Sequence, residues 1–194
     1  MAYTTQPLTP ATWPAFDALV HDHNGVFGGC WCLSFHPKVV GLSYEQRRAA
    51  KRELVARQQA HAALVFEGEA CIGWCQFGSP VELPEIKNKK NYAATQTGAP
   101  PSWRITCFFV DRHHRKQGVA AAALAGALRQ IAELGGGVVE AYPEDTHGTM
   151  VSPTFLHAGT AAMFEAAGFV PDRLIGKNKW VVVKTVGARP APAS

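Results

Sequence analysis

The chain has 194 residues, of which 47% are hydrophobic and 18% are charged, and its net charge at pH 7 is +4. This length suits one domain, and the apolar content is sufficient for a core, so wholesale disorder is excluded. No apolar run is long enough to span a bilayer and the N-terminus lacks a secretory pattern, so we expect a cytoplasmic protein with no membrane partner. The net positive charge is small, and the sequence has no run of interleaved aromatic and basic residues, so we expect no nucleic-acid partner either.

The first 60 residues predict two helices joined by a loop rich in glycine and cysteine. Apolar residues recur at helical spacing over residues 9–23, where Thr12 is placed to cap the helix. Ser43 precedes a second helical run, over residues 44–59. The runs 61–66 and 70–77 follow, separated by a short glycine-containing turn, and predict an antiparallel hairpin.

The long polar connection at residues 80–102 predicts one short helix, at 82–88. The remainder alternates strands with helices, which predicts an α/β fold with a mixed sheet. The expected elements are strands at 103–110, 138–142 and 180–186 and helices at 118–134 and 154–167. We expect one domain over residues 1–187, divided into N-terminal helices and loop (1–60) and a core (61–187), with a flexible tail at 188–194.

The sequence CFFVDRHHRKQGVA places a short basic loop between the strongest predicted strand and a helix. The first amides of a helix lack intrahelical partners, and the helix dipole adds positive charge at that end. Gly118 lets an anion approach the backbone, Ala120 keeps the next turn thin, and Arg115 and Lys116 add charge. The pattern therefore predicts an anion cradle, although a strand-to-helix turn with solvated charges is the plainer alternative. The glycine spacing fits neither a P-loop nor a dinucleotide-binding fold.

The arrangement Arg-x-x-Gly-x-Ala after a strand resembles motif A of the GNAT superfamily of N-acetyltransferases. The segments GEACIGWCQFG and FLHAGTAAMFEAAGF also resemble that superfamily, in its central hairpin and in the helix that ends in Gly-Phe. The likeness covers roughly residues 62–183. It implies a mostly antiparallel central sheet flanked by helices, with a splayed parallel strand pair that makes room for an acetyl group. The combined motifs also look like a subgroup of uncharacterised bacterial GNAT proteins.

The resemblance implies acetyl-CoA as co-substrate and no metal. The backbone of residues 108–110 would pair with the pantetheine arm, an amide near Phe109 or Val110 would polarise the thioester carbonyl, and the amides of 117–121 would hold the pyrophosphate. The expected cofactor-binding residues are Phe108, Phe109, Val110, Arg115, Lys116, Gln117, Gly118, Val119, Ala120 and Ala121.

The catalytic residues depart from the superfamily pattern. Many members carry a tyrosine acid four residues before the glycine of the Gly-Phe pair, where this chain has Phe164, and an asparagine seven residues earlier, where it has His157. Tyr142 is a candidate replacement for the acid, and Glu140, two residues before it on the same strand face, is a candidate base. A half-buried aromatic and a surface carboxylate are the plainer interpretations of these two residues.

The acceptor is not encoded in a motif. In the resembled fold the first helices border the acceptor site, so Cys30 and Trp31 are candidate substrate-binding residues. The five cysteines are an odd number without an export signal, which indicates reduced thiols, and Cys30 and Cys32 lack zinc-ligand spacing. We expect acetyl transfer to a primary amine of a small molecule or peptide. The alternative is a non-catalytic acyl-CoA-binding sensor or regulatory module, and a homodimer is compatible with either.

Overall fold

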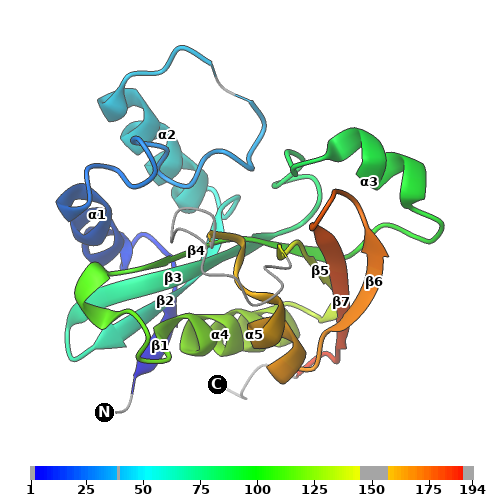
Figure 1. Ribbon diagram of the computed structural model, residues 1–194. Helices are drawn as coiled ribbons and strands as arrows, with labels where there is room; N and C mark the ends of the chain where they lie inside the picture. Colours follow the sequence, from blue (N-terminus) through cyan, green and yellow to red (C-terminus); the bar gives the residue numbers. More distant parts are fainter. Residues whose placement is uncertain (1–2, 39, 145–156, 190–194) are drawn as a thin grey trace.

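The computed structural model of the chain describes residues 3–38, 40–144 and 157–189. Its centre is a seven-stranded sheet in the order β1-β2-β3-β4-β5-β7-β6 (Figure 1). The β4–β5 pair is parallel and the other neighbours are antiparallel. This is the α/β fold with a mixed, mostly antiparallel sheet that the sequence predicts. The strands are β1 (Thr4–Pro7), β2 (His61–Glu67), β3 (Ala70–Gly78), β4 (Trp103–Val110), β5 (Gly137–Ala141), β6 (Val170–Leu174) and β7 (Trp180–Val186).

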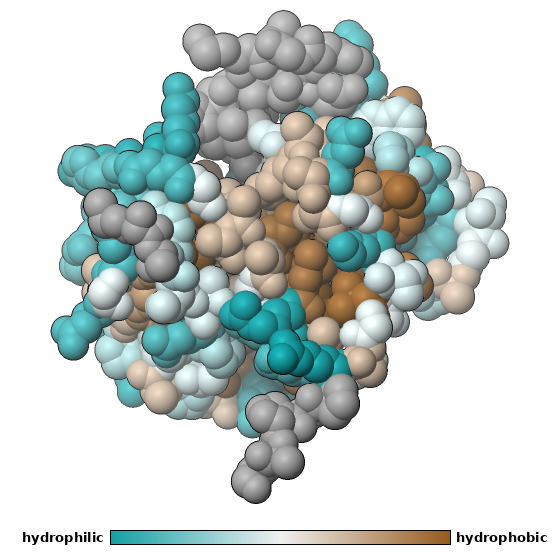
Figure 2. All heavy atoms as spheres, turned by 90° about the horizontal axis from the view of Figure 1, so that it is seen from below, coloured by the Kyte–Doolittle hydropathy of each residue, from teal (hydrophilic) through white to brown (hydrophobic). Residues whose placement is uncertain are grey.

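Helices cover both faces of the sheet. In Figure 1, α4 and α5 lie on one side of it, and α1 and α2 lie on the other. Figure 2 views the molecule from the side of α4 and α5 and shows apolar atoms gathered in the middle of that face between hydrophilic residues. No helix in the described ranges is long and apolar enough to cross a membrane. The helices are α1 (Trp13–Asp22), α2 (Tyr44–Ala56), α3 (Lys89–Thr95), the 3-10 turn η1 (Arg112–His114), α4 (Val119–Glu133) and α5 (Ala161–Ala166).

Local sequence explains the best-predicted elements. Ser43 begins α2 with a full capping box: its hydroxyl accepts from the Gln46 N–H, and the Gln46 side chain accepts from the Ser43 N–H. β2 and β3 form the expected antiparallel hairpin, with a register shift between Val65 and Phe66. Buried apolar positions of α4 recur at helical spacing and pack against β2, β3 and β4. The local sequences of these elements are therefore sufficient to predict them.

Two strands were not predicted, and both lie at edges of the sheet. β1 pairs only with β2, and β6 pairs only with β7. Each contains a proline, Pro7 or Pro171, which an edge strand tolerates because it leaves one row of backbone groups unpaired. Their residues are mostly exposed, so the apolar alternation that marks a half-buried strand is missing from their sequences.

Three predicted helices differ from the observed ones. The helix expected at 82–88 is wrong: that stretch is irregular, and α3 begins after it, at Lys89. The first helix begins at Trp13 rather than residue 9, and the Thr12 hydroxyl donates to the carbonyl of Pro7 instead of capping the helix. The helix expected at 154–167 is shorter, since α5 spans Ala161–Ala166. Residues 154–156 of that prediction, and 190–194 of the expected tail, lie outside the described residues.

The parallel pair at the centre of the sheet is splayed, as the resemblance implied. β5 pairs with β4 only from Trp103 to Ile105, while β4 continues to Val110 with β3 alone as its neighbour. The N–H of Asp111 donates to Ile72 O, which makes their positions a hydrogen-bonded pair of the antiparallel ladder. Because such pairs alternate along a ladder, the backbone groups of Val110 and Phe108 point away from β3. The second half of β4 therefore has an open edge.

Candidate active site

The turn before α4 exposes backbone at the start of a 15-residue helix. Gly118 occupies the N-cap position with a left-handed backbone (φ 83°), and no side chain caps this end. A Cβ added at Gly118 would meet no atom within 4 Å, so the space in front of the turn is open. Lys116 is also left-handed (φ 60°), a conformation that non-glycine residues rarely adopt. The first amides of α4 are thus free to receive an anion.

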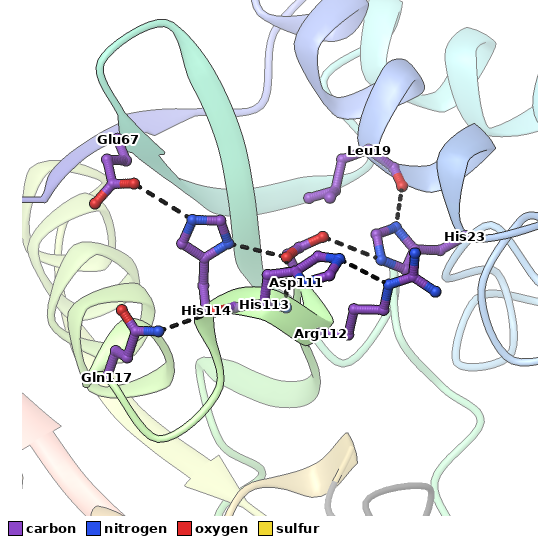
Figure 3. Close-up of polar contacts among 8 residues, drawn as sticks. All are labelled: Leu19, His23, Glu67, Asp111, Arg112, His113, His114 and Gln117. Carbon is purple, nitrogen blue, oxygen red and sulfur yellow. Dashed lines mark hydrogen bonds and ion pairs between the residues drawn. The ribbon is translucent and has the colours of Figure 1, made fainter.

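A chain of polar contacts holds this turn in place (Figure 3). Asp111 accepts from the His113 N–H at 2.7 Å and contacts His114 Nδ1 at 2.9 Å, and its other oxygen lies 3.2 Å from His23 Nε2, on the segment after α1. His114 Nε2 lies 3.3 Å from a Glu67 oxygen at the end of β2. Asp111 therefore links the basic turn to the segment after α1, and His114 links it to the end of β2.

Charge and burial shift the pKa values of the residues in this network of polar contacts. Burial opposes ionisation of Asp111, but hydrogen bonds from His114 and from the His113 N–H, with the field of His23, outweigh it and lower the pKa of Asp111. The pKa of His114 is raised, first by its hydrogen bond to Asp111 and then by Glu67, with burial opposing. Each shift favours the charged form of its own group, so the contacts between Asp111 and His114 extend the pH range in which the two form an ion pair.

The open edge of β4 and the start of α4 border one cavity of about 620 Å³, which we call the β4 groove. Nine of the ten residues predicted to bind the cofactor line it. The exception is Gln117, whose side chain instead donates to His113 O at 2.9 Å. The groove is lined by Phe27, Phe108, Phe109, Val110, His114, Arg115, Lys116, Gly118, Val119, Ala120, Ala121, His157, Gly159, Thr160 and Met163.

A second cavity, of about 550 Å³, adjoins the first, and we call it the loop cavity. The two share Phe27 and His157, whose rings meet edge to face with centroids 5.7 Å apart. Of the two predicted acceptor-side residues, Cys30 lines the loop cavity and Trp31 does not. The loop cavity is lined by Phe27, Cys30, Cys32, Ser34, Phe35, Lys38, Glu85, Ile86, Lys87, Cys107 and His157.

Trp31 lies in the core instead. Its side chain is fully buried, stacks on Trp13 with ring centroids 6.2 Å apart, and meets Phe16 and Tyr44 edge on. The left-handed backbone of Trp31 (φ 49°) turns the ring inward. Trp31 therefore supports the wall that presents Cys30 and Cys32.

The structure brings Glu140 and Tyr142 together but away from both cavities. The Glu140 carboxylate accepts from Tyr142 at 3.0 Å and from Tyr92 at 2.8 Å, and it pairs with Arg173 at 3.2 Å. Arg104 contacts the Tyr92 hydroxyl at 3.4 Å. Burial raises the pKa of Tyr142 well above its ordinary value. The catalytic role of Glu140 and Tyr142 stays a prediction, and neither residue lines the β4 groove or the loop cavity.

The two departures from the expected motif have different surroundings. Phe164 is fully buried and packs edge on against Phe108 and Phe169, so its position belongs to the core beneath the groove. His157 lies at the junction of both cavities. Sequence reasoning missed His157, Phe27 and Cys107 as cavity residues. For His157 the sequence did offer a signal, since it occupies the asparagine position of the motif. Phe27 and Cys107 come from a loop and a strand that only the fold brings together.

Within the described ranges, no group of three or more His, Cys, Asp or Glu is arranged to hold a metal ion. The five cysteines are free thiols. The site consists of exposed helix amides, basic side chains, an open strand edge and two adjoining cavities. This combination belongs to an α/β protein with room for an extended anionic ligand along one strand.

Comparison with known proteins identifies the class. The sequence model of the Acetyltransferase (GNAT) family matches residues 16–149, which is more than half of the chain, and no curated protein matches it. The chain therefore belongs to the acetyltransferase (GNAT) family.

Solved structures share the fold over nearly the whole chain. A protein from Corynebacterium glutamicum, described as histone acetyltransferase HPA2 and related acetyltransferase, is 19% identical to this chain. Its TM-score is 0.53, and the match covers 99% of this chain and 100% of that one. An N-acetyltransferase from Staphylococcus aureus is 11% identical with a TM-score of 0.53, covering 96% and 99%. The protein yncA from Salmonella typhimurium, solved with its cofactor acetyl-CoA, is 12% identical with a TM-score of 0.54, covering 100% and 99%.

Proposed function

We propose that this protein transfers an acetyl group from acetyl-CoA to a primary amine by direct attack of the amine on the thioester. One observation carries the proposal: the β4 groove and the loop cavity meet at Phe27 and His157, beside the half of β4 that β5 leaves unpaired. The groove suits an extended phosphorylated thioester, and the adjoining cavity suits a second, smaller substrate. Membership of the acetyltransferase family and the neighbour solved with acetyl-CoA support the cofactor.

The chain's own groups fit each part of that cofactor. The free amides at the start of α4, with Arg115 and Lys116, would neutralise the pyrophosphate. The outward backbone groups of Phe108 and Val110 would pair with the amides of the pantetheine arm, as an added strand does. A Val110 N–H aimed at the thioester oxygen would stabilise the negative charge that develops during attack. Glycine at position 118 matters because the pyrophosphate would approach the backbone there.

The loop cavity would hold the acceptor. Its walls combine apolar side chains, including Phe35 and Ile86, with charged groups of both signs at Lys38 and Glu85. Lys38 and Glu85 lie 3.7 Å apart, so they largely offset each other. This composition favours a small or terminal amine with an apolar neighbour over a highly charged acceptor.

The experiment is a thiol-release assay with acetyl-CoA and a panel of amines, run beside calorimetry of acetyl-CoA binding. The proposal expects coenzyme A release that depends on one class of amine. Binding of acetyl-CoA without release by any amine would instead support the acyl-CoA sensor, which Phe164 in place of a tyrosine acid favours. Failure to bind acetyl-CoA would refute both functions.

A further inference from the structure

A third cavity, of about 570 Å³, lies between α2 and the loop that joins α1 to α2, and we call it the α2 cavity. On the helix it is bordered by side chains from Arg47 to Arg57. It shares Cys30, Ser34 and Lys38 with the loop cavity, and it shares no lining residue with the β4 groove. The α2 cavity therefore continues the loop cavity.

The loop cavity lies between the other two cavities. It meets the β4 groove at Phe27 and His157, and it meets the α2 cavity at a different set of residues. A molecule that reaches from the groove to the α2 cavity must therefore cross the loop cavity. On this path it would pass the apolar side chains of Phe35 and Ile86.

Most ionisable groups that line the α2 cavity leave little net charge there. Lys38 lies 3.7 Å from Glu85, and Arg57 lies 2.5 Å from Glu53, so each of these cations has a carboxylate partner. Burial lowers the pKa of His36 to about 2, so its ring is neutral. A ligand in the cavity would therefore meet few uncompensated charges from these groups.

Arg47 is the exception among the cations that line this cavity. Its side chain is half-buried, and within the described part of the chain it forms no ion pair and donates only to Gly29 O, at 3.3 Å. The next residue of α2 differs: Arg48 lies 2.5 Å from Asp17 and 3.7 Å from Glu45. Arg47 therefore presents to the cavity a guanidinium whose remaining N–H groups can bind an anion through paired hydrogen bonds.

Resting on the proposed function, we propose that the acceptor is a small molecule with a primary amine at one end and a carboxylate at the other, and that Arg47 binds the carboxylate. The amine would lie where the loop cavity meets the β4 groove, and an apolar spacer would cross the loop cavity. Apolar walls at Leu33, Leu42 and Leu54 would strengthen the contact between guanidinium and carboxylate. Since the cavity also contains Glu53, a singly charged carboxylate fits it better than a doubly charged phosphate.

The arrangement of the cavities also sets the form of the acceptor. Glycine and the other α-amino acids hold an amine and a carboxylate on the same carbon atom, so they cannot place the two groups in different cavities. Aminohexanoate, with its amine on the terminal carbon, has a methylene chain between them. We therefore expect activity to rise along the series of terminal amino acids from glycine to aminohexanoate, and a series in which glycine is the best acceptor would contradict the proposal.

The kinetic test compares acceptors of nearly equal shape and different charge. Aminohexanamide is the neutral counterpart of aminohexanoate. We expect the wild type to use the carboxylate with a kcat/KM about 10- to 10²-fold higher, because charge-assisted hydrogen bonds are formed only with the carboxylate. Aminopentylphosphonate, which carries more negative charge, should be used less well than aminohexanoate. Equal use of the carboxylate and the amide, or a preference for the phosphonate, would overturn the proposal.

Variants of Arg47 test whether this side chain causes the preference. Arg47→Gln should lower kcat/KM for aminohexanoate to the level of aminohexanamide and leave the amide nearly unaffected. Arg47→Lys keeps the charge without the planar fork and should retain part of the preference. An equal fall with both acceptors would mean that Arg47 only supports the loop at Gly29, and the proposal would be wrong. The matched control is Arg52→Gln, since Arg52 is exposed on the same helix and lines neither the α2 cavity nor the loop cavity, and it should keep the wild-type preference.

A binding measurement tests the subsite without turnover. Hexanoate has the carboxylate and the methylene chain but no amine, and saturation-transfer NMR reports its contact with the protein while coenzyme A is present to occupy the β4 groove. We expect transfer to hexanoate in the wild type and in Arg52→Gln, and much weaker transfer in Arg47→Gln. Equal transfer in Arg47→Gln would overturn the proposal and leave the proposed function standing. If the wild type acetylates no amine, the proposed function fails, and the hexanoate measurement still decides whether Arg47 binds a carboxylate.

Discussion

Replacing Gly118 with glutamate tests the anion cradle at the start of α4. An added Cβ meets open space there, so the substitution should not disturb packing. The left-handed backbone (φ 83°) costs a non-glycine residue about 1–2 kcal/mol of local strain. The new carboxylate would stand where we place the pyrophosphate.

The electrostatic penalty is larger than the strain. Two unit charges about 4 Å apart near a protein surface repel by about 4 kcal/mol at an effective dielectric constant of about 20. Since each ~1.4 kcal/mol is a factor of ten in affinity, we expect acetyl-CoA to bind about 10²- to 10³-fold more weakly, the lower value allowing for solvent screening at an open groove. Most of this loss comes from charge, so Gly118→Ala should weaken binding far less.

Calorimetric titration with acetyl-CoA measures the affinity, and thermal unfolding confirms the fold. The matched control is Gly68→Glu in the β2–β3 turn, where the backbone is also left-handed (φ 60°) and the space is also open. It adds the same charge away from the β4 groove and should bind acetyl-CoA like the wild type. If Gly118→Glu binds as tightly as Gly118→Ala, the pyrophosphate does not sit at this helix start and the reasoning fails.

Two further substitutions test the polar networks. Tyr142→Phe removes one hydrogen bond to the buried Glu140 carboxylate and should lower the free energy of unfolding by about 1.5–3 kcal/mol with kcat unchanged. A large fall in kcat at constant acetyl-CoA affinity would instead establish Tyr142 as the acid. His114→Gln should destabilise the fold most below pH 6.5, the ordinary histidine pKa. The pKa of His114 is raised in the folded protein, so its contribution to stability is fully present below pH 6.5 and is lost as the pH rises through its pKa in the folded state. Chemical denaturation at several pH values checks this, and a stability difference that grows above neutral pH would contradict it. The same difference should also fade in acid, as Asp111, with its lowered pKa, becomes protonated.

The candidate site was predictable where its parts are local in sequence. The strand, basic turn and helix from residues 103 to 134 are consecutive in the chain. The apolar run, Gly118 and the helical periodicity predict each of them from the sequence alone. Nine of the predicted groove residues come from this one segment. The side chains of the loop between α1 and α2 were harder to place from sequence, because glycine- and cysteine-rich sequences do not show which side chain turns inward. Cys30 lines the loop cavity, while Trp31 is core.

The sequence by itself therefore determined the α/β class, the hairpin and the open turn at Gly118, since each follows from hydrophobic periodicity or the conformational freedom of one glycine. The tertiary structure decided the edge strands β1 and β6, whose polar, proline-bearing sequences carry no alternation and form strands only because a neighbour offers backbone partners. It also decided the lining of the loop cavity, where Cys30 and Cys32 meet Cys107 and Ile86. These residues come from a loop, a strand and the connection before α3, far apart in the chain, and only the packing of the loop between α1 and α2 beside β4 brings them together.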